Sequence, residues 1–288
     1  MKRNIYTPMT AAPWKRDQAY QEMIPKSLEL TGSIRCFWGS GRPFIKTASD
    51  PGTTVVIPDT CADIIYQIDH TENTITGIFC GINDRSFIDE QKAKPGNQIS
   101  VFGIRFYAWA ASAFSEDSLK GTVNGCCDVQ SRFCWLDGQL RQQLFETRTL
   151  EERGALAEEL LLRHSRPPRQ HRAVEVGVNQ ILLRKGNISA AQLAGECFIS
   201  SRQLERLFHD YIGITPKKLC SLVRYQCLWN QLLKNPGLDL LDAVYQYGYA
   251  DQSHLIREFK RYHTMNIQSA VGYAYKHVGN IQDCPKAL

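Results

Sequence analysis

The chain has 288 residues, of which 43% are hydrophobic and 22% charged, and a formal net charge of +5. No run approaches the roughly 18 apolar residues that a membrane span requires, so we expect no membrane partner. No apolar stretch follows the basic N-terminus, so we also expect no signal peptide and a cytoplasmic location. The length allows two domains, each with its own core.

The charge is divided unevenly along the chain. Residues 1–162 carry 17 Lys and Arg against 20 Asp and Glu, a net charge of −3, whereas residues 163–288 carry 17 against 9, a net charge of +8. Positive surface charge attracts phosphate and supplies most of the non-specific affinity for nucleic acid. The second half is therefore the one expected to meet a polyanion, provided that a motif supports the charge.

Short strand-like segments fill the first half. TTVVI, ADIIYQID and ISVFGIRFYAWAA are rich in β-branched and aromatic residues and are separated by Pro-Asp, Asn-Asp and Pro-Gly turn signals. They predict a mostly antiparallel β unit over residues 20–112. Leucines near helical spacing between residues 136 and 161 predict one or two amphipathic helices after it.

The segment RHSRPPRQHR, residues 163–172, separates the strand-like half from a half without strand signals. Adjacent prolines block helix continuation and four arginines keep the segment in water, so it is typical of a linker. We predict an α+β protein with a β-rich sensor or dimerisation domain and flanking helices over residues 1–162. A linker over 163–173, an all-helical domain over 174–276 and a tail over 277–288 would follow.

The segment ISAAQLAGECFISSRQLERLFHDYIGITP predicts a helix, a tight turn and a second helix. Ser189 and Ser200 each begin a capping-box pattern. Gly213 ends the second helix, and Pro216 suits the first turn of the next one. Apolar and polar residues of the second helix fall on different faces: Leu204, Leu207, Phe208 and Tyr211 against Ser201, Arg202, Glu205 and Arg206.

The same unit recurs 51 residues later. Gly248 marks its turn and Asp251 is a candidate N-cap. Between the copies lie roughly 19 residues, about 28 Å if helical, a spacer that can set two helices about one DNA turn apart. The matching pairs are Leu204 and Leu255, Arg206 and Arg257, Phe208 and Phe259, and Tyr211 and Tyr262.

In these motifs the last hundred residues resemble the DNA-binding domain of the AraC/XylS family of bacterial transcription regulators. The matching residues are LA at 193–194, SSRQLERLF from Ser200, GITP from Gly213, Arg224, and GYADQSHLIREFKRYH from Gly248. The resemblance implies recognition helices over 200–211 and 251–262. The DNA-contacting candidates on these helices are Ser200, Ser201, Arg202, Gln203, Glu205 and Arg206, then Gln252, Ser253, Ile256 and Arg257. We expect Lys217, Lys218 and the linker arginines to contact mostly phosphate, which fixes the register.

The sequence departs from the family pattern at the turns. The second copy usually ends in a glycine and a proline, but Thr264 and Ile267 stand in those places. Phe198 stands where the first turn often has glycine. Because the GITP ending survives only in the first copy, we expect the first recognition helix to be the better-defined reader.

The first half resembles, over residues 20–125, a sensor-type domain that precedes the same DNA-binding domain in some family members. VIPDTCADIIYQID and FGIRFYAWAASAF carry this resemblance. Candidate effector-binding residues are Trp38, Asp59, Asp63, Tyr66 and Arg105. A turn-stabilising aspartate and a structural ion pair explain the charged three equally well, and aromatic residues on strands are more often plain core.

The ten cysteines show neither a C-x-x-C pair nor a metal-ligand spacing, so we expect free buried thiols and neither metal nor cofactor. No phosphate-binding glycine loop, nucleophile elbow or HExxH motif is present, so we expect no catalytic residue and no enzyme. The leading hypothesis is an effector-responsive transcription regulator whose partners are double-stranded promoter DNA, RNA polymerase, a small-molecule effector and a second copy. The alternatives are a cysteine-based redox or metal-responsive regulator and a DNA-repair methyl acceptor.

Overall fold

The computed structural model describes residues 6–10, 20–45, 53–90, 96–164 and 169–278. An antiparallel sheet, with strand order β1-β2-β8-β5-β6-β9 and β3 also paired to β8, forms the first half. Strands β4 and β7 form a separate pair. The strands are β1 (Tyr20–Met23), β2 (Ile34–Ser40), β3 (Phe44–Ile45), β4 (Thr53–Val56), β5 (Cys61–Asp69), β6 (Thr74–Cys80), β7 (Phe87–Glu90), β8 (Gln98–Tyr107) and β9 (Cys126–Asp128).

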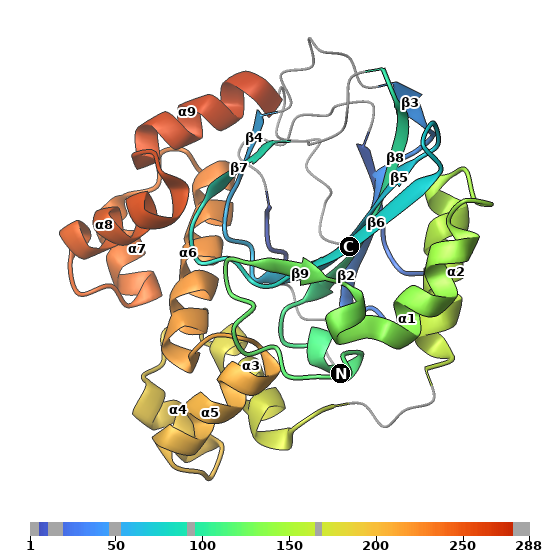
Figure 1. The fold of residues 1–288 in the computed structure, drawn as a ribbon. Helices are drawn as coiled ribbons and strands as arrows, with labels where there is room; N and C mark the ends of the chain where they lie inside the picture. The colour runs from blue at the N-terminus through green and yellow to red at the C-terminus, as the bar shows by residue number, and fades with distance from the viewer. Residues whose placement is uncertain (1–5, 11–19, 46–52, 91–95, 165–168, 279–288) are drawn as a thin grey trace.

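Two helices, α1 (Gln130–Gln143) and α2 (Leu150–Leu162), cover one face of this sheet (Figure 1). Along β5, Ile64, Tyr66 and Ile68 are fully buried because alternate residues of a strand point to the same face. They share one apolar core with leucines of both helices. The predicted β unit and the predicted helices after it are therefore confirmed.

The second half is helical. Trp229, Tyr225 and Leu222 of α6 are fully buried, and α6 packs against helices of both halves of this region. Figure 1 shows α4 and α5 below the other helices and α7 and α8 at the left. The helices are α3 (Arg172–Leu183), α4 (Ala190–Glu196), α5 (Ser201–Tyr211), α6 (Pro216–Lys234), α7 (Leu240–Tyr247), α8 (Gln252–His263) and α9 (Ile267–Val278). The predicted α+β fold is confirmed.

The helix starts follow the capping residues of the sequence. Ser189 opens α4 with a complete capping box, and Ser200 Oγ accepts a hydrogen bond from Gln203 N at 3.2 Å at the start of α5. Asp251 Oδ1 accepts from His254 N at 2.6 Å at the start of α8. Both helix-turn-helix units therefore begin their second helix as predicted.

The turns close in the left-handed region even where glycine is missing. Gly213 has a φ of 90°, and Phe198 and Thr264 take φ values of 55° and 62°. Residues with a side chain adopt this conformation at some cost in free energy, so tertiary packing must hold it. Thr264 thus closes α8, and Asn266, whose Oδ1 accepts from Ser269 N at 2.8 Å, assists the start of α9. The unusual ending of the second copy is accommodated without loss of the helix.

The two halves share apolar core. Ile57, Ile82 and Ala108, all from the first half, are at most 1% exposed and pack within the core of the helices. The segment 6–10, here called the N-terminal arm, lies against α6: Met9 N donates to Gln226 Oε1 at 2.8 Å, and Gln226 Nε2 donates to Met9 O at 2.9 Å. The division at residues 162 and 174 stays a prediction, since α2 ends at Leu162 and α3 begins at Arg172, with 165–168 outside the described residues.

The cysteine prediction is wrong for one pair. Cys80 and Cys126, paired across β6 and β9, form a disulfide. Their 46-residue separation hides this pairing, because only the fold makes the two strands neighbours. Within the described part of the chain, the free thiols are those of Cys36, Cys61, Cys127, Cys134, Cys197, Cys220 and Cys227, and Cys284 lies outside it.

Within the same ranges, no helix is both long and apolar enough to pass through a bilayer. No group of three or more His, Cys, Asp or Glu side chains among the described residues is arranged to hold a metal ion. The metal-responsive alternative therefore has no candidate ligand set in the part of the molecule that the structure describes.

Candidate nucleic-acid interface

Helix α5 presents one face to the protein and the other to solvent. Leu204, Leu207 and Phe208 are buried in the helical core. Tyr211 is half-buried and packs at the edge of the same core. The predicted DNA-contacting residues on the other face are all exposed: Ser200, Ser201, Arg202, Gln203, Glu205 and Arg206. This helix can therefore be inserted into a groove without unpacking its own domain.

Helix α8 repeats the arrangement. Leu255 and Phe259 are buried, whereas the predicted contact residues Gln252, Ser253, Ile256 and Arg257 are exposed. The apolar Ile256 is 40% exposed, which places a methyl-rich side chain among the polar ones. Apolar side chains of this kind contact the thymine methyl group in the major groove.

An ion pair fixes α8 to α6. Arg224 Nε lies 3.2 Å from Glu258 Oε1, and Ser221 Oγ donates to Glu258 Oε2 at 2.7 Å. The Glu258 side chain is 9% exposed, so this pair is largely screened from solvent. The family motif singles out Arg224, but the sequence does not predict the role of Glu258 as its partner. A charged residue on a helix is equally compatible with a position in solvent.

The two predicted phosphate-binding lysines differ in their surroundings. Lys217 is exposed, but Lys218 Nζ lies 2.7 Å from Asp84 Oδ2 of the first half. A linker arginine, Arg169, likewise lies 3.2 Å from Asp210 Oδ2. Two basic side chains expected on phosphate are therefore held by carboxylates in this structure.

Further basic residues extend the exposed surface beyond the predicted set. Lys260 and Arg261 are exposed in the last turn of α8. Their signal in the sequence is the run Lys-Arg itself, which also suits the negative end of the helix dipole. They are positioned to add positive charge beside the face that carries Arg257.

These features can be compared with known proteins. The family described as a helix-turn-helix domain matches residues 193–269, which run from α4 into α9 and contain both exposed faces. Residues 193–269 form an AraC-type helix-turn-helix domain. A family described only as a domain of unknown function, DUF6597, matches residues 21–128 ahead of it. An AraC-type domain is the DNA-binding part of a transcription regulator, which agrees with the charge of this half.

Solved structures resemble the chain at low identity. A probable AraC family transcriptional regulator from Rhodopseudomonas palustris CGA009 is 21% identical, covers 36% of this chain and 98% of its own, and has a TM-score of 0.31. ToxT from Vibrio cholerae is 12% identical over 82% of this chain and 98% of its own, with a TM-score of 0.38. Unsaturated fatty acid bound ToxT from V. cholerae strain SCE256 is 11% identical, covers 97% and 99%, and has a TM-score of 0.39. No curated protein matches the chain.

Ahead of the AraC-type domain, four of the five predicted effector residues come together. Arg105 Nε donates to Asp63 Oδ1 at 2.9 Å, and Trp38 Nε1 donates to the same oxygen at 2.9 Å. The Arg105 guanidinium also lies 3.8 Å from Asp59 Oδ2 and 5.5 Å from the centre of the Trp38 ring. Gly103 leaves room for the indole, since an added Cβ would lie 2.2 Å from it.

This group, the Arg105 cluster, is largely satisfied internally. Thr10 Oγ1 donates to Asp59 Oδ2 at 2.6 Å and accepts from Arg105 Nη1. Asp59 also caps its own turn, because its Oδ1 accepts from Cys61 N at 3.0 Å. Asp59 thus stabilises a turn and Asp63 forms an ion pair with Arg105, which are the contacts that a structural role for these residues requires. The bonds of Thr10 also tie the cluster to the N-terminal arm.

Tyr66 lies apart from the Arg105 cluster. Neighbouring residues of a strand point to opposite faces, and Tyr66 is three positions along β5 from Asp63, so the two side chains lie on opposite faces. Tyr66 shares the helix-covered face with Ile64 and Ile68. Its burial, with the nearby Asp137 carboxylate, raises the pKa of its phenol. The structure thus divides the predicted effector set between the two faces of the sheet.

Proposed function

We propose that the chain is a sequence-specific regulator that reads promoter DNA by placing α5 and α8 in the major groove. One observation carries the proposal: two matched helices, both packed on α6, expose polar faces whose arginines stand 51 residues apart in sequence, Arg206 and Arg257. The net charge of +8 on residues 163–288 supports it, because phosphate attraction supplies the sequence-independent part of DNA affinity.

The exposed side chains would divide their roles by chemistry. Arginine makes bidentate contacts with guanine, and glutamine does so with adenine, each good pair contributing about 1–3 kcal/mol of discrimination. Arg206 and Arg257 are the proposed guanine readers, and Gln203 and Gln252 the adenine readers. Lys217 would contact phosphate and fix the register. RNA polymerase and a second copy of the chain are the proposed protein partners at the promoter.

The first half is the proposed sensor. Its N-terminal arm is hydrogen-bonded both to the Arg105 cluster, through Thr10, and to α6, through Met9. A ligand can shift the balance between domain arrangements only if it binds one arrangement better than another. Contacts that join the sensor to the helix carrying both units are where such a difference would act.

Selection from random duplex DNA by the full chain tests the DNA-reading proposal. We expect enriched sites with two short motifs about one helical turn apart, since two helices on one side of the duplex enter successive major grooves. Binding to the enriched duplex should exceed binding to a shuffled duplex at the same salt concentration. Failure to enrich any motif, or equal affinity for the enriched and the shuffled duplex, would reject sequence-specific reading.

The disulfide favours a second candidate, a regulator that responds to oxidation. Cytosolic disulfides are uncommon and, where present, are usually catalytic or redox-sensing. Cys80 and Cys126 join β6 to β9, and Cys127 beside them is a half-buried free thiol. The affinity of the enriched duplex, measured for the oxidised and the fully reduced chain, tests this candidate. A matching affinity in both states would set it aside.

A further inference from the structure

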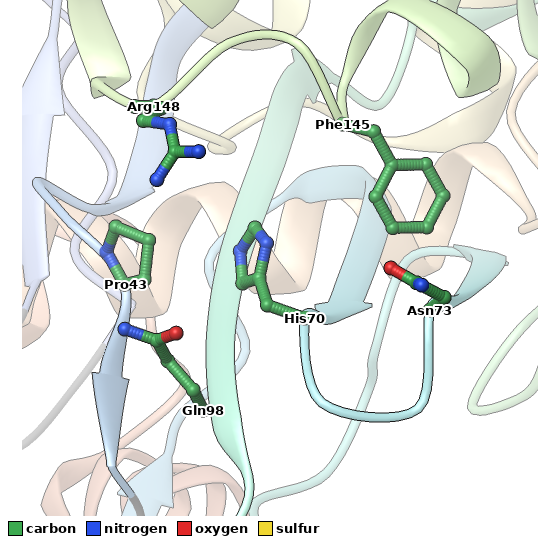
Figure 2. Close-up of a pocket in the computed structure, with 6 residues that line it drawn as sticks. All are labelled: Pro43, His70, Asn73, Gln98, Phe145 and Arg148. Carbon is green, nitrogen blue, oxygen red and sulfur yellow. The ribbon is translucent and has the colours of Figure 1, made fainter.

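A second polar site lies in the first half, away from the Arg105 cluster. It is a cavity of about 480 Å³ between the turn that joins β5 to β6 and the loop that joins α1 to α2. Figure 2 shows His70 at its centre, with Arg148 and Gln98 on one side near Pro43 and with Phe145 and Asn73 on the other. The lining therefore combines two apolar surfaces with cationic and amide donors.

Positive charge dominates the polar lining. Arg148 is exposed toward the cavity, and its backbone N, rather than its side chain, binds Glu152 Oε2 at 2.7 Å. Glu152 also accepts from Thr149 N as part of a capping box, so its carboxylate is already engaged. No ion pair involves the Arg148 guanidinium among the described residues.

A buried arginine stands behind the cavity. Arg153 is fully buried, and its Nη2 donates to Ser100 Oγ at 2.9 Å and to Thr147 O at 3.1 Å. Its Nε and Nη1 have no hydrogen-bond partner in the part of the chain described here. Burial lowers the pKa of Arg153 to about 10. The charge of Glu152 opposes this shift without outweighing it, and no carboxylate among the described residues forms an ion pair with Arg153. A buried charge that is incompletely compensated is costly, so this guanidinium favours a nearby anion.

His70 connects the buried arginine to the cavity. Its Nε2 lies 2.8 Å from Ser100 Oγ, the same hydroxyl that receives the Arg153 donor. Burial lowers the pKa of His70, and the charges of Arg153 and Arg148 lower it further. The nearest opposing charge, Asp69, is engaged elsewhere: its oxygens accept from Thr71 N, Glu72 N and Asn97 Nδ2.

We propose that this cavity binds a small organic anion, with its carboxylate or phosphate group held by Arg148 and His70 and its apolar body against Phe145 and Pro43. Gln98 and Asn73 supply further amide donors, and Arg153 supplies a fixed positive charge behind the site. Arginine is suited to both anionic groups because its planar fork binds two oxygens at once. The inference gives the proposed effector response a chemical class and depends on that proposal only for its biological role.

The location fits a sensor site. Strands β5 and β8 run from this cavity to the interface with the helices: β5 begins beside Asp59 and ends beside His70, and β8 runs from Gln98 toward Ala108 in the shared core. The site is thus joined to the helical half by two central, fully paired strands.

Binding can be tested on the DNA-free full chain with benzoate and phenyl phosphate as probes and neutral benzyl alcohol as control. The imidazole signals of the seven histidines are followed by NMR at constant ionic strength, and His70→Asn assigns the His70 signal. We expect a saturable shift of that signal with at least one anion and none with the alcohol. A response to phenyl phosphate alone would identify phosphate as the preferred group, and a response to benzoate alone would identify carboxylate.

A matched pair of arginine variants completes the test. Arg148→Gln should weaken anion binding by about tenfold or more, because it removes a charge-assisted donor. Arg163→Gln, at the other end of α2 and paired there with Glu159, should bind as the parent does. No saturable shift with either anion, equal binding of the alcohol, or unchanged binding in Arg148→Gln would overturn the proposal. Because DNA is absent, none of these results depends on DNA reading.

Discussion

Lys218 Nζ of α6 lies 2.7 Å from Asp84 Oδ2 of the first half, and both side chains are about one-fifth exposed, at 23% and 21%. Asn124 Nδ2 donates to the other Asp84 oxygen at 2.7 Å. Burial opposes ionisation of Asp84, but the hydrogen bonds from Lys218 and Asn124 outweigh it and lower the pKa of that carboxyl. A lysine expected to meet phosphate is thereby held by the other half of the protein.

The Asp84–Lys218 pair predicts that Asp84→Asn strengthens DNA binding. Removing the carboxylate frees Lys218 for phosphate and removes a negative charge beside it, so affinity should rise about threefold to tenfold with a salt slope steeper by about one contact. Fluorescence anisotropy against salt concentration measures both quantities. Lys218→Ala should change the parent little and cancel the gain in Asp84→Asn. A Lys218→Ala loss in the parent as large as that of Lys217→Ala would show that Lys218 leaves Asp84 on DNA.

The matched arginines predict two separable losses of specificity. Arg206→Ala and Arg257→Ala should each weaken binding to the enriched duplex by about 1–3 kcal/mol and relax selection at one base position. Lys217→Ala should instead weaken all duplexes similarly and lower the salt slope by about one. Arg42→Ala, an exposed arginine of the first half outside the predicted DNA-contacting set, is the matched control. Parent-like affinity and selection in both arginine variants would move the recognition faces elsewhere.

Local features of the fold could be predicted because they are local in sequence. Ser189, Ser200 and Asp251 cap helices through bonds to residues three positions away, and the alternation along β5 is visible within nine residues. The pairs that join the halves could not be predicted, since Met9 and Gln226 are 217 positions apart and form no pattern. The cavity lined by His70 and Arg148 has the same origin, because segments far apart in sequence build it.

The buried Gln226 side chain predicts a strong stability effect at the domain interface. It is fully buried and serves Met9 N, Met9 O and Pro58 O. Gln226→Met keeps the length of the side chain but leaves these backbone groups unpaired, so the free energy of unfolding should fall by about 2–5 kcal/mol. Asn230→Ala, which removes a 3.2 Å bond to Thr7 O at the rim and a 2.9 Å bond to Gln226 O within α6, should cost about 1 kcal/mol or less. Urea unfolding measures both, and equal losses would contradict a central role for Gln226.

His263 predicts a pH-dependent term in stability. It is 1% exposed, lies 2.8 Å by Nδ1 from the Tyr225 hydroxyl and stacks on Phe259, and burial lowers its pKa from 6.5 to about 4. The unfolded chain therefore binds a proton more readily than the folded one. The contribution of neutral His263 to the free energy of unfolding is complete above about pH 6.5 and falls by roughly 3 kcal/mol as the pH drops to about 4.

His263→Phe tests this term while keeping an aromatic ring in the cluster. The difference in unfolding free energy between variant and parent, measured by urea titration at several pH values, should move in favour of the variant by roughly 3 kcal/mol between pH 7 and pH 4. Parallel curves for the two proteins over that range would assign the acid sensitivity to other groups.

The core that Ile57, Ile82 and Ala108 share with the helices has a consequence for how such regulators diversify. Recombination that exchanges the first half for another domain must also match these side chains and the N-terminal arm to α6, or else leave apolar surface exposed to water. The two halves therefore cannot be exchanged independently of each other. Chimaeras should retain residues 6–10, 57, 82 and 108 together with the helices that these residues touch.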